Sequence, residues 1–159
     1  GQDHDAPIRI VETVVQVNDL RKRAMGRKIV KALGGDARGK TVALLGLTFK
    51  PNTDDMRDAP SIDIIHGLLE RGAKVRAYDP QAMKEAARVL PDVTMCENAY
   101  EACEHGDVLV IMTEWNQFRM LDLGRVKGLL NRPAIVDLRN VYKPGPMREA
   151  GFTYVSVGR

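Results

Sequence analysis

From Thr41 onward, short apolar runs alternate with longer amphipathic stretches. The apolar runs contain few polar positions, which is typical of strands buried on both faces of a parallel sheet. The predicted strands are residues 42–45, 75–78, 93–95, 108–112, 135–138 and 154–157, and the predicted helices are residues 62–69, 81–89, 99–103, part of 121–130, and 147–150. Strands and helices in this order form a doubly wound sheet with right-handed crossovers. The sequence therefore predicts an α/β, Rossmann-like domain with a doubly wound parallel sheet.

A single long helix is predicted ahead of this domain, over residues 7–33. Apolar side chains recur there near helical spacing, Pro7 suits the first turn, and Gly34-Gly35 is a strong stop signal. At 1.5 Å per residue the helix would be about 40 Å long, more than a compact domain needs. We expect residues 1–38 to form an interdomain or dimerisation helix with a linker, and residues 39–159 to form the Rossmann-like domain. The basic second half of the helix is either a solvated face or a surface for phosphate or a partner.

Composition narrows the class of ligand. The 159 residues carry a formal net charge of +3, and 5% of them are aromatic. A mildly basic chain suits an anionic ligand, but so few aromatic residues argue against a base-stacking nucleic-acid platform. No apolar run approaches the ~20 residues that span a bilayer, so we expect no membrane association. The two cysteines, Cys96 and Cys103, form no C-x-x-C pair, which fits a reduced, cytoplasmic protein.

The stretch from Val42 to Pro60 has the parts of an anion site. An apolar run ends at Gly46, a polar loop carries Lys50 and Arg57, and Pro60 opens an amphipathic stretch. Cationic side chains would meet the unpaired N–H groups of a helix start there. Since ligands of doubly wound sheets bind at the carboxyl ends of the strands, this loop is well placed to bind one.

A dinucleotide-binding turn would read G-x-G-x-x-G after the first strand, but only its first glycine, Gly46, is present. Side chains such as Lys50 and Arg57 must then supply the contacts that backbone N–H groups make in such a turn. Asp79, after the second predicted strand, has two interpretations. It either resembles the acid that holds a ribose in Rossmann domains or begins a helix together with Pro80.

Three carboxylates in the loop, Asp54, Asp55 and Asp58, also have two interpretations. They either pair with Arg57 and order the loop, or they hold a metal ion. A helix start and two cations close by argue against a metal. We therefore predict no metal site and expect some of the acids to order the loop.

Residues 46–61, G-L-T-F-K-P-N-T-D-D-M-R-D-A-P-S, resemble the signature loop of the C-terminal domain of the UDP-glucose 6-dehydrogenases, in the UDP-glucose/GDP-mannose dehydrogenase family. Further segments match that family in the same order: Val17-Asn18-Asp19, Tyr78-Asp79-Pro80, Met112-Thr113-Glu114-Trp115 and Val136-Asp137-Leu138-Arg139-Asn140. The resemblance covers nearly the whole chain, and a loop of this length with fixed charges is a specific motif.

The resemblance implies an activity and its partners. Such enzymes oxidise UDP-glucose twice, with two NAD, to UDP-glucuronate, and the NAD is bound mainly by an N-terminal dehydrogenase domain. Residues 39–159 would be the UDP-sugar-binding domain. The long helix would join the two domains and carry the contact of a homodimer.

The resemblance assigns contacts with the UDP-sugar to Phe49, Lys50 and Arg139. The lysine would supply positive charge near the diphosphate. Arg57 would reach the NAD held by the other domain, where its planar fork suits phosphate. Taken alone, Arg139 also fits a surface ion pair with Asp137 or Glu114.

The chain departs from the family in the residues of the chemical step. The family's nucleophilic cysteine lies in a C-F-P-K-D segment, which is absent here, as are the N-terminal G-x-G-x-x-G and the region of the acid/base lysine. Cys96 and Cys103 have no neighbouring group in sequence that would activate a thiol, and no histidine matches a catalytic position. We therefore assign no catalytic residue to this chain and expect it to be inactive alone, as a fragment of a longer enzyme.

Three alternatives remain open. UDP-N-acetylmannosamine and GDP-mannose dehydrogenases share the architecture and much of the loop, although the run P-N-T-D-D-M-R-D-A-P favours UDP-glucose. A free-standing nucleotide-sugar binding module would need no catalytic partner. A pure dimerisation scaffold would explain the long helix but would leave Lys50, Arg57 and Arg139 without a role.

Overall fold

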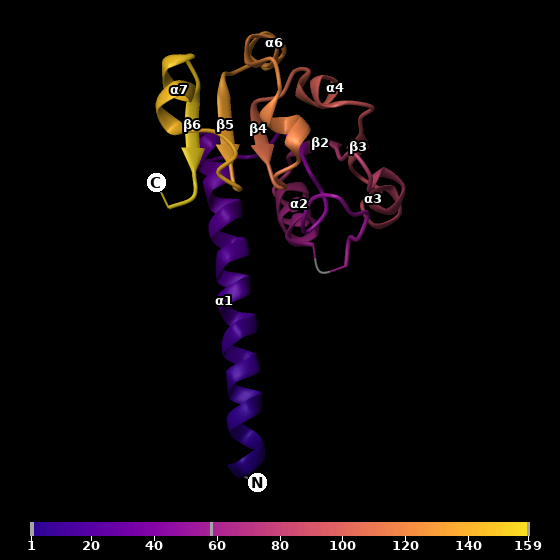
Figure 1. Cartoon of the computed structure of the whole chain (residues 1–159), viewed down its shortest axis with the longest axis vertical. Helices are drawn as coiled ribbons and strands as arrows, with labels where there is room; N and C mark the ends of the chain where they lie inside the picture. The colour runs from indigo at the N-terminus through magenta and orange to yellow at the C-terminus, as the bar shows by residue number, and fades with distance from the viewer. Residues whose placement is uncertain (1, 58, 159) are drawn as a thin grey trace.

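The computed structural model describes residues 2–57 and 59–158, and within the first helix it describes side chains from residue 16 on, except residue 18. Six parallel strands form one sheet in the order β3-β2-β1-β4-β5-β6, as Figure 1 shows. The strands are β1 Thr41–Leu45, β2 Lys74–Tyr78, β3 Thr94–Met95, β4 Val108–Ile111, β5 Ala134–Asp137 and β6 Thr153–Ser156. The helices are α1 Gln2–Ala32, α2 Pro60–Glu70, α3 Met83–Val89, α4 Ala99–Cys103, α5 Asn116–Arg119, α6 Leu123–Leu129 and α7 Pro144–Glu149. The predicted doubly wound α/β fold is confirmed.

The centre of the sheet is buried on both faces. Every residue of β4 and β5 is buried, as are four residues of β1. Successive side chains of a strand point to opposite faces, so Val42 and Leu44 enter one core while Ala43 and Leu45 enter the other. The first core also contains residues of α1, α2 and α3, and the second contains residues of α4, α5, α6 and α7. The sheet is therefore covered on both sides.

The strand order reverses between β1 and β4, which are paired although residues 46–107 separate them in sequence. The chain enters β1 at the middle of the sheet, winds out to β3, and returns to β4 on the other side of β1. The loops that follow β1 and β4 therefore lie next to each other at the carboxyl edge of the sheet, in contact through Thr48 and Thr113. This is the position at which open α/β sheets bind their ligands.

Helix α1 begins at Gln2 rather than at residue 7, so Pro7 does not lie in its first turn as predicted. It ends as predicted, because Gly34 and Gly35 follow with φ angles of 92° and 93° that suit glycine. Ile29 is fully buried in the core against α2 and the sheet, whereas the first half of α1 extends away from the sheet (Figure 1). Only the last part of this helix is therefore part of the domain core.

Two helices differ from the prediction for identifiable reasons. Helix α3 begins at Met83 rather than at residue 81, because the carboxylate of Asp79 binds the N–H groups of Gln81 and Ala82 in a turn ahead of it. The single turn α5 was not predicted, since four residues are too few for a periodic pattern. Within the described part of the chain, no helix is both long enough and apolar enough to cross a membrane.

Candidate functional site

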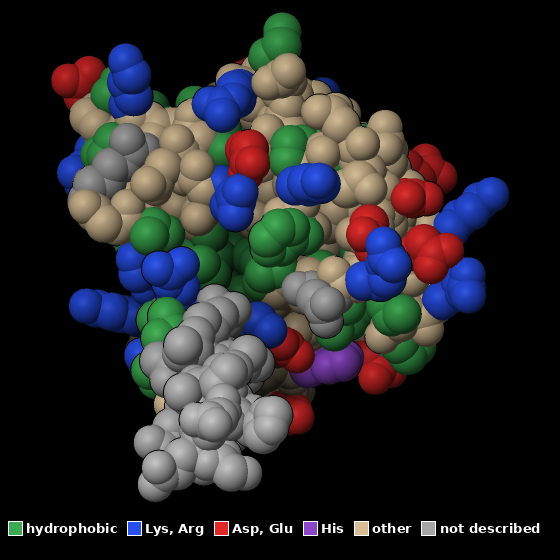
Figure 2. Space-filling view, turned by 60° about the horizontal axis from the view of Figure 1, so that its bottom comes forward, with side chains coloured by type: hydrophobic (Ala, Val, Ile, Leu, Met, Phe, Trp, Pro, Cys, Tyr) green, Lys and Arg blue, Asp and Glu red, His purple; other side chains and the backbone are tan. Residues whose placement is uncertain are grey.

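The loops after β1, β4 and β5 meet at the carboxyl edge of the sheet. Figure 2 brings this edge toward the viewer and shows a hollow with hydrophobic side chains in it and Lys and Arg side chains around it. A cavity of about 30 Å³ in this region is lined by residues from α1, from all three loops and from the start of α2. The site is therefore assembled from segments that are far apart in sequence.

Gly46 allows the loops after β1 and β4 to approach closely. Its φ is 91°, and a Cβ added there would lie 2.6 Å from Cβ and 2.8 Å from the backbone N of Thr113. The hydroxyl of Thr113 in turn donates to the carbonyl of Thr48 at 2.7 Å. Only glycine fits at this position, because any side chain would push the two loops apart.

Asp79 ties the loop after β1 to the loop after β2. Its side chain is fully buried, and one carboxylate oxygen accepts from the N–H of Leu47 at 2.7 Å and of Thr48 at 3.4 Å. The other oxygen accepts from Gln81 and Ala82, both at 2.9 Å. The helix-start interpretation is wrong in its position, because α3 begins at Met83 with Ala82 as its N-cap, and Asp79 holds the turn ahead of it. In the ribose interpretation, the carboxylate would have to give up backbone partners for a ribose.

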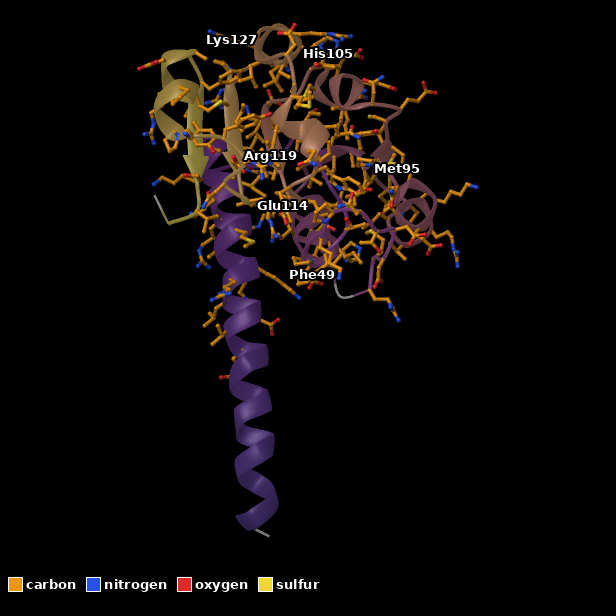
Figure 3. The ribbon with its side chains drawn as sticks, viewed as in Figure 1. Phe49, Met95, His105, Glu114, Arg119 and Lys127 are labelled. Carbon is orange, nitrogen blue, oxygen red and sulfur yellow. The ribbon has the colours of Figure 1, made fainter. Side chains whose placement is uncertain are left out.

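Phe49 and Arg139 line the cavity together. Phe49 is 57% exposed although it is aromatic. Met25 of α1 and Pro60 at the start of α2 line the same cavity. Figure 3 shows Phe49 at the edge of the molecule and Glu114 between it and the sheet. Lys50 is exposed next to Phe49 but does not line this cavity.

The loop after β5, which carries Arg139, is held by a buried carboxylate. Asp137 accepts from the backbone N–H of Arg139 at 3.2 Å and of Tyr142 at 2.9 Å, and from the hydroxyl of Tyr154 at 2.5 Å. The side chain of Asn140 binds both the N–H and the carbonyl of Val157, each at 3.0 Å. These bonds fix the backbone from which the arginine side chain projects.

Arg139 forms a two-point ion pair with Glu114. Its Nη2 donates to Oε1 at 3.0 Å, and its Nε donates to Oε2. Hydrogen bonding from this guanidinium is the main reason that the pKa of Glu114 lies below its ordinary value. The ion pair that the sequence left as an alternative is thus confirmed, with Glu114 rather than Asp137 as the partner, and it coexists with a place on the cavity.

Arg57 lies apart from this cavity. It lines a second, open cavity of about 770 Å³ together with Asp54 and residues of α3. Its Nε and Nη2 donate to the two carboxylate oxygens of Asp55 at 3.0 and 3.1 Å, and these bonds lower the pKa of Asp55 to about 2. The expected ordering of the loop by an acid is confirmed for Asp55, whereas Asp58 lies outside the described residues. Among the side chains that the structure describes, no group of three is placed to hold a metal ion.

The two cysteines, His66 and His105 are not part of the site. Cys96 and Cys103 are buried, and burial raises the pKa of both thiols, to about 12 for Cys103, which disfavours the reactive thiolate. His105 lies at the opposite edge of the sheet from Phe49 (Figure 3) and His66 is exposed on α2. The side chain of His4 lies outside the described ones.

The sequence did not point to Met25 or Tyr154 as parts of the site, and it indicated Thr113 only as a member of a segment that resembles the family. Met25 fits the apolar pattern of a helix. The hydroxyls of Thr113 and Tyr154 donate to residues that lie 65 and 17 positions away in sequence. No local pattern marks such partners. The available signal was the position of Thr113 directly after a predicted strand, at the edge where ligands bind.

The chain is similar to known proteins over most of its length. The model of the UDP-glucose/GDP-mannose dehydrogenase family, UDP binding domain, matches residues 43–144. The UDP-glucose 6-dehydrogenase of Rhizobium meliloti is 52% identical over 159 residues, covering 100% of this chain and 36% of that protein. The enzyme of that name from Pseudomonas aeruginosa is 40% identical, covering 95% of this chain and 35% of that protein. The chain thus spans about a third of the length of these relatives.

Solved structures show the same fold. A UDP-glucose dehydrogenase from Pyrobaculum islandicum superposes with a TM-score of 0.74 at 34% identity, covering 92% of this chain and 32% of that one. A GDP-mannose dehydrogenase from Pseudomonas aeruginosa gives a TM-score of 0.70 at 19% identity, covering 93% of this chain and 34% of that one. The second likeness, at such low identity, concerns the fold alone.

Proposed function

The chain belongs to the UDP-glucose/GDP-mannose dehydrogenase family, and from this premise we propose that it is the C-terminal, UDP-sugar-binding part of an NAD-dependent UDP-glucose 6-dehydrogenase. The resemblance that residues 46–61 carry is thereby confirmed at the level of the family. The proposed parent reaction converts UDP-glucose to UDP-glucuronate. Its substrate would be held at the carboxyl edge of this sheet.

The meeting of Phe49 and Arg139 on one cavity is the observation that carries the proposal. A guanidinium has N–H groups beyond those that Arg139 gives to Glu114, and these would donate to diphosphate oxygens. Lys50 would add positive charge next to Phe49, whose exposed ring would contact the nucleotide sugar. Three side chains from two loops would thus bind and orient the substrate without taking part in bond breaking.

A bound dinucleotide does not fit the first turn of this sheet. The N–H groups of Leu47 and Thr48 already bind the carboxylate of Asp79, and the second and third glycines of the fingerprint are missing. In the proposed enzyme, NAD would therefore be bound mainly by the N-terminal domain and would accept the hydride from C6 there. Arg57, on the second cavity, would reach it after release of Asp55.

In the proposed enzyme, different segments of the chain have different roles. Residues 1–38 would link the two domains and form the contact of a homodimer, and residues 39–159 would bind the UDP-sugar. The nucleophilic cysteine would belong to the N-terminal domain. The chain studied alone would then bind UDP-glucose weakly and would not reduce NAD.

Calorimetric titration of the chain with UDP-glucose tests the proposal. Arg139→Ala and Lys50→Ala should each weaken binding by about tenfold, because each removes a charge-assisted contact to the diphosphate. Added salt should weaken binding too. Arg38→Ala is the matched control, since it breaks a similar exposed pair with Asp36 at the far edge of the sheet. Unchanged affinity in both site variants would contradict the proposal.

Two other functions remain candidates. The domain would belong to a UDP-N-acetylmannosamine or GDP-mannose dehydrogenase if those nucleotide sugars displaced UDP-glucose in a competition titration. The relatives with the highest identity quoted above favour UDP-glucose. A free-standing binding module would instead be indicated if the coding sequence upstream of Gly1 contained neither a dinucleotide fingerprint nor a cysteine segment.

A further inference from the structure

The first turn of the sheet binds a carboxylate of its own chain. In a dinucleotide site, N–H groups after the first strand face the pyrophosphate, and an acid after the second strand accepts from a ribose. Here those two groups bind each other. One carboxylate oxygen of Asp79 accepts from the N–H of Leu47 at 2.7 Å and from that of Thr48 at 3.4 Å, and the side chain is fully buried.

The carbonyl groups of the same loop are bound as well. Leu47 accepts from the hydroxyl of Ser61 at 2.6 Å, and Thr48 accepts from Thr113 at 2.7 Å. The carbonyl of Lys50 accepts from the hydroxyl of Thr48 at 2.8 Å. The N–H and carbonyl groups of both Leu47 and Thr48 are therefore bound within the domain.

The two residues that follow this bound pair are exposed. Leu47 is fully buried and Thr48 is 3% exposed, whereas Phe49 is 57% exposed and Lys50 is exposed next to it. The direction of these two outward side chains depends on the anchored pair before them. Asp79 is the one side chain that binds both N–H groups of that pair.

We propose that Asp79 is a positioning residue that takes the place of a ligand anion in the first turn and thereby sets Phe49 and Lys50 toward the nucleotide sugar. This inference rests on the proposed function. It explains how a Rossmann-like sheet without the glycine-rich turn would bind its ligand through side chains. It also gives a buried acid an effect on substrate affinity.

Asp79→Asn tests the inference because the amide keeps the shape of the side chain. One of its two terminal atoms becomes an N–H₂ donor, which cannot accept from a backbone N–H. Affinity for UDP-glucose, measured by calorimetry on the full chain, should fall about three- to tenfold. Asp107→Asn is the matched control, since Asp107 accepts from the N–H of Thr41 at 2.8 Å at the opposite end of β1. It should leave the affinity unchanged.

A double-mutant cycle with Lys50→Ala separates positioning from plain stability. If Asp79 acts through Lys50, Asp79→Asn should weaken binding clearly less in the Lys50→Ala background than in the wild type. A merely structural role would lower the affinity by the same factor in both backgrounds. Equal factors would therefore overturn the inference.

The remaining outcomes distinguish this inference from the proposed function. If Lys50→Ala and Arg139→Ala both leave UDP-glucose binding unchanged, the result contradicts the proposed site and, with it, the inference. If they weaken binding while Asp79→Asn does not, the inference alone is overturned. Should Asp79→Asn fail to fold, Thr113→Val, which frees the carbonyl of Thr48 in the same loop, is taken through the same cycle with the same criteria.

Discussion

At the scale of single residues, Gly46 has little freedom to change. From the sequence it is the one remaining glycine of a dinucleotide fingerprint. In the structure its role is steric, because a Cβ would lie within 2.8 Å of side-chain and backbone atoms of Thr113. A positive φ of 91° adds a second cost for any other residue. The glycine is retained for the approach of two loops rather than for a phosphate.

We therefore predict that Gly46→Ala lowers the free energy of unfolding by about 3 kcal/mol, from the left-handed backbone together with overpacking. Urea unfolding followed by circular dichroism measures this. Gly67→Ala is the control, because nothing lies within 4 Å of its added Cβ and it sits inside α2. That variant should be unchanged or slightly stabilised. Equal effects of the two substitutions would contradict the steric explanation.

At the scale of elements, the loop after β5 depends on strand β6. Tyr154 of β6 donates to Asp137 at the end of β5, and the same carboxylate holds the N–H of Arg139. Strand β6 is an edge strand of the sheet, yet it thereby supports the loop that carries a predicted ligand contact. The last strand is thus linked to the candidate site through one buried hydrogen bond.

Tyr154→Phe should lower the free energy of unfolding by about 1–3 kcal/mol, because a buried carboxylate loses a donor. It should also speed hydrogen exchange at the amides of Arg139 and Tyr142, which bind the same carboxylate. Tyr100→Phe is the matched control, since its hydroxyl accepts from the N–H of Asp122 in an exposed position. Exchange that is equally fast in both variants would argue against the role of Tyr154 in the loop.

At the scale of the whole molecule, α1 belongs partly to the domain and partly to its surroundings. Ile29 and Leu33 are buried in the core of the sheet, and Met25 lines the site. Closer to the N-terminus of the helix, the side chains of Val17 and Leu20 are 43% and 58% exposed. The proposed boundary between residues 38 and 39 therefore divides the sequence after the helix. It does not divide the hydrophobic core, because the last turns of α1 pack into the core of residues 39–159.

Ile29→Ala should lower the free energy of unfolding by about 2–5 kcal/mol, as for other fully buried aliphatic residues. Leu20→Ala should change it by about 0.5 kcal/mol or less when measured on the monomer at low concentration. If α1 forms the proposed homodimer contact, Leu20→Ala should nevertheless weaken self-association in analytical ultracentrifugation. Loss of stability in the Leu20 variant at low concentration would contradict this division of the helix.

Much of the fold follows from patterns that are local in sequence. The buried strands are short apolar runs, and their alternation with amphipathic stretches leaves a doubly wound parallel sheet as the natural arrangement. The end of α1 follows from Gly34 and Gly35, because a pair of glycines supplies the left-handed backbone of a helix stop. The predicted ends of elements are less accurate, as at α3, where a carboxylate outside the helix sets the first turn.

The family, the sheet and the residues with charge near its carboxyl edge were therefore determined by the sequence itself. The tertiary structure decided which of them meet. It brought Phe49 and Arg139 to one cavity, placed Arg57 on another, paired Arg139 with Glu114, and turned Asp79 onto the N–H groups of a loop 32 residues away. The reason is physical: periodicity and turn chemistry act between near neighbours, whereas these contacts depend on strand order and register, which only the folded sheet establishes.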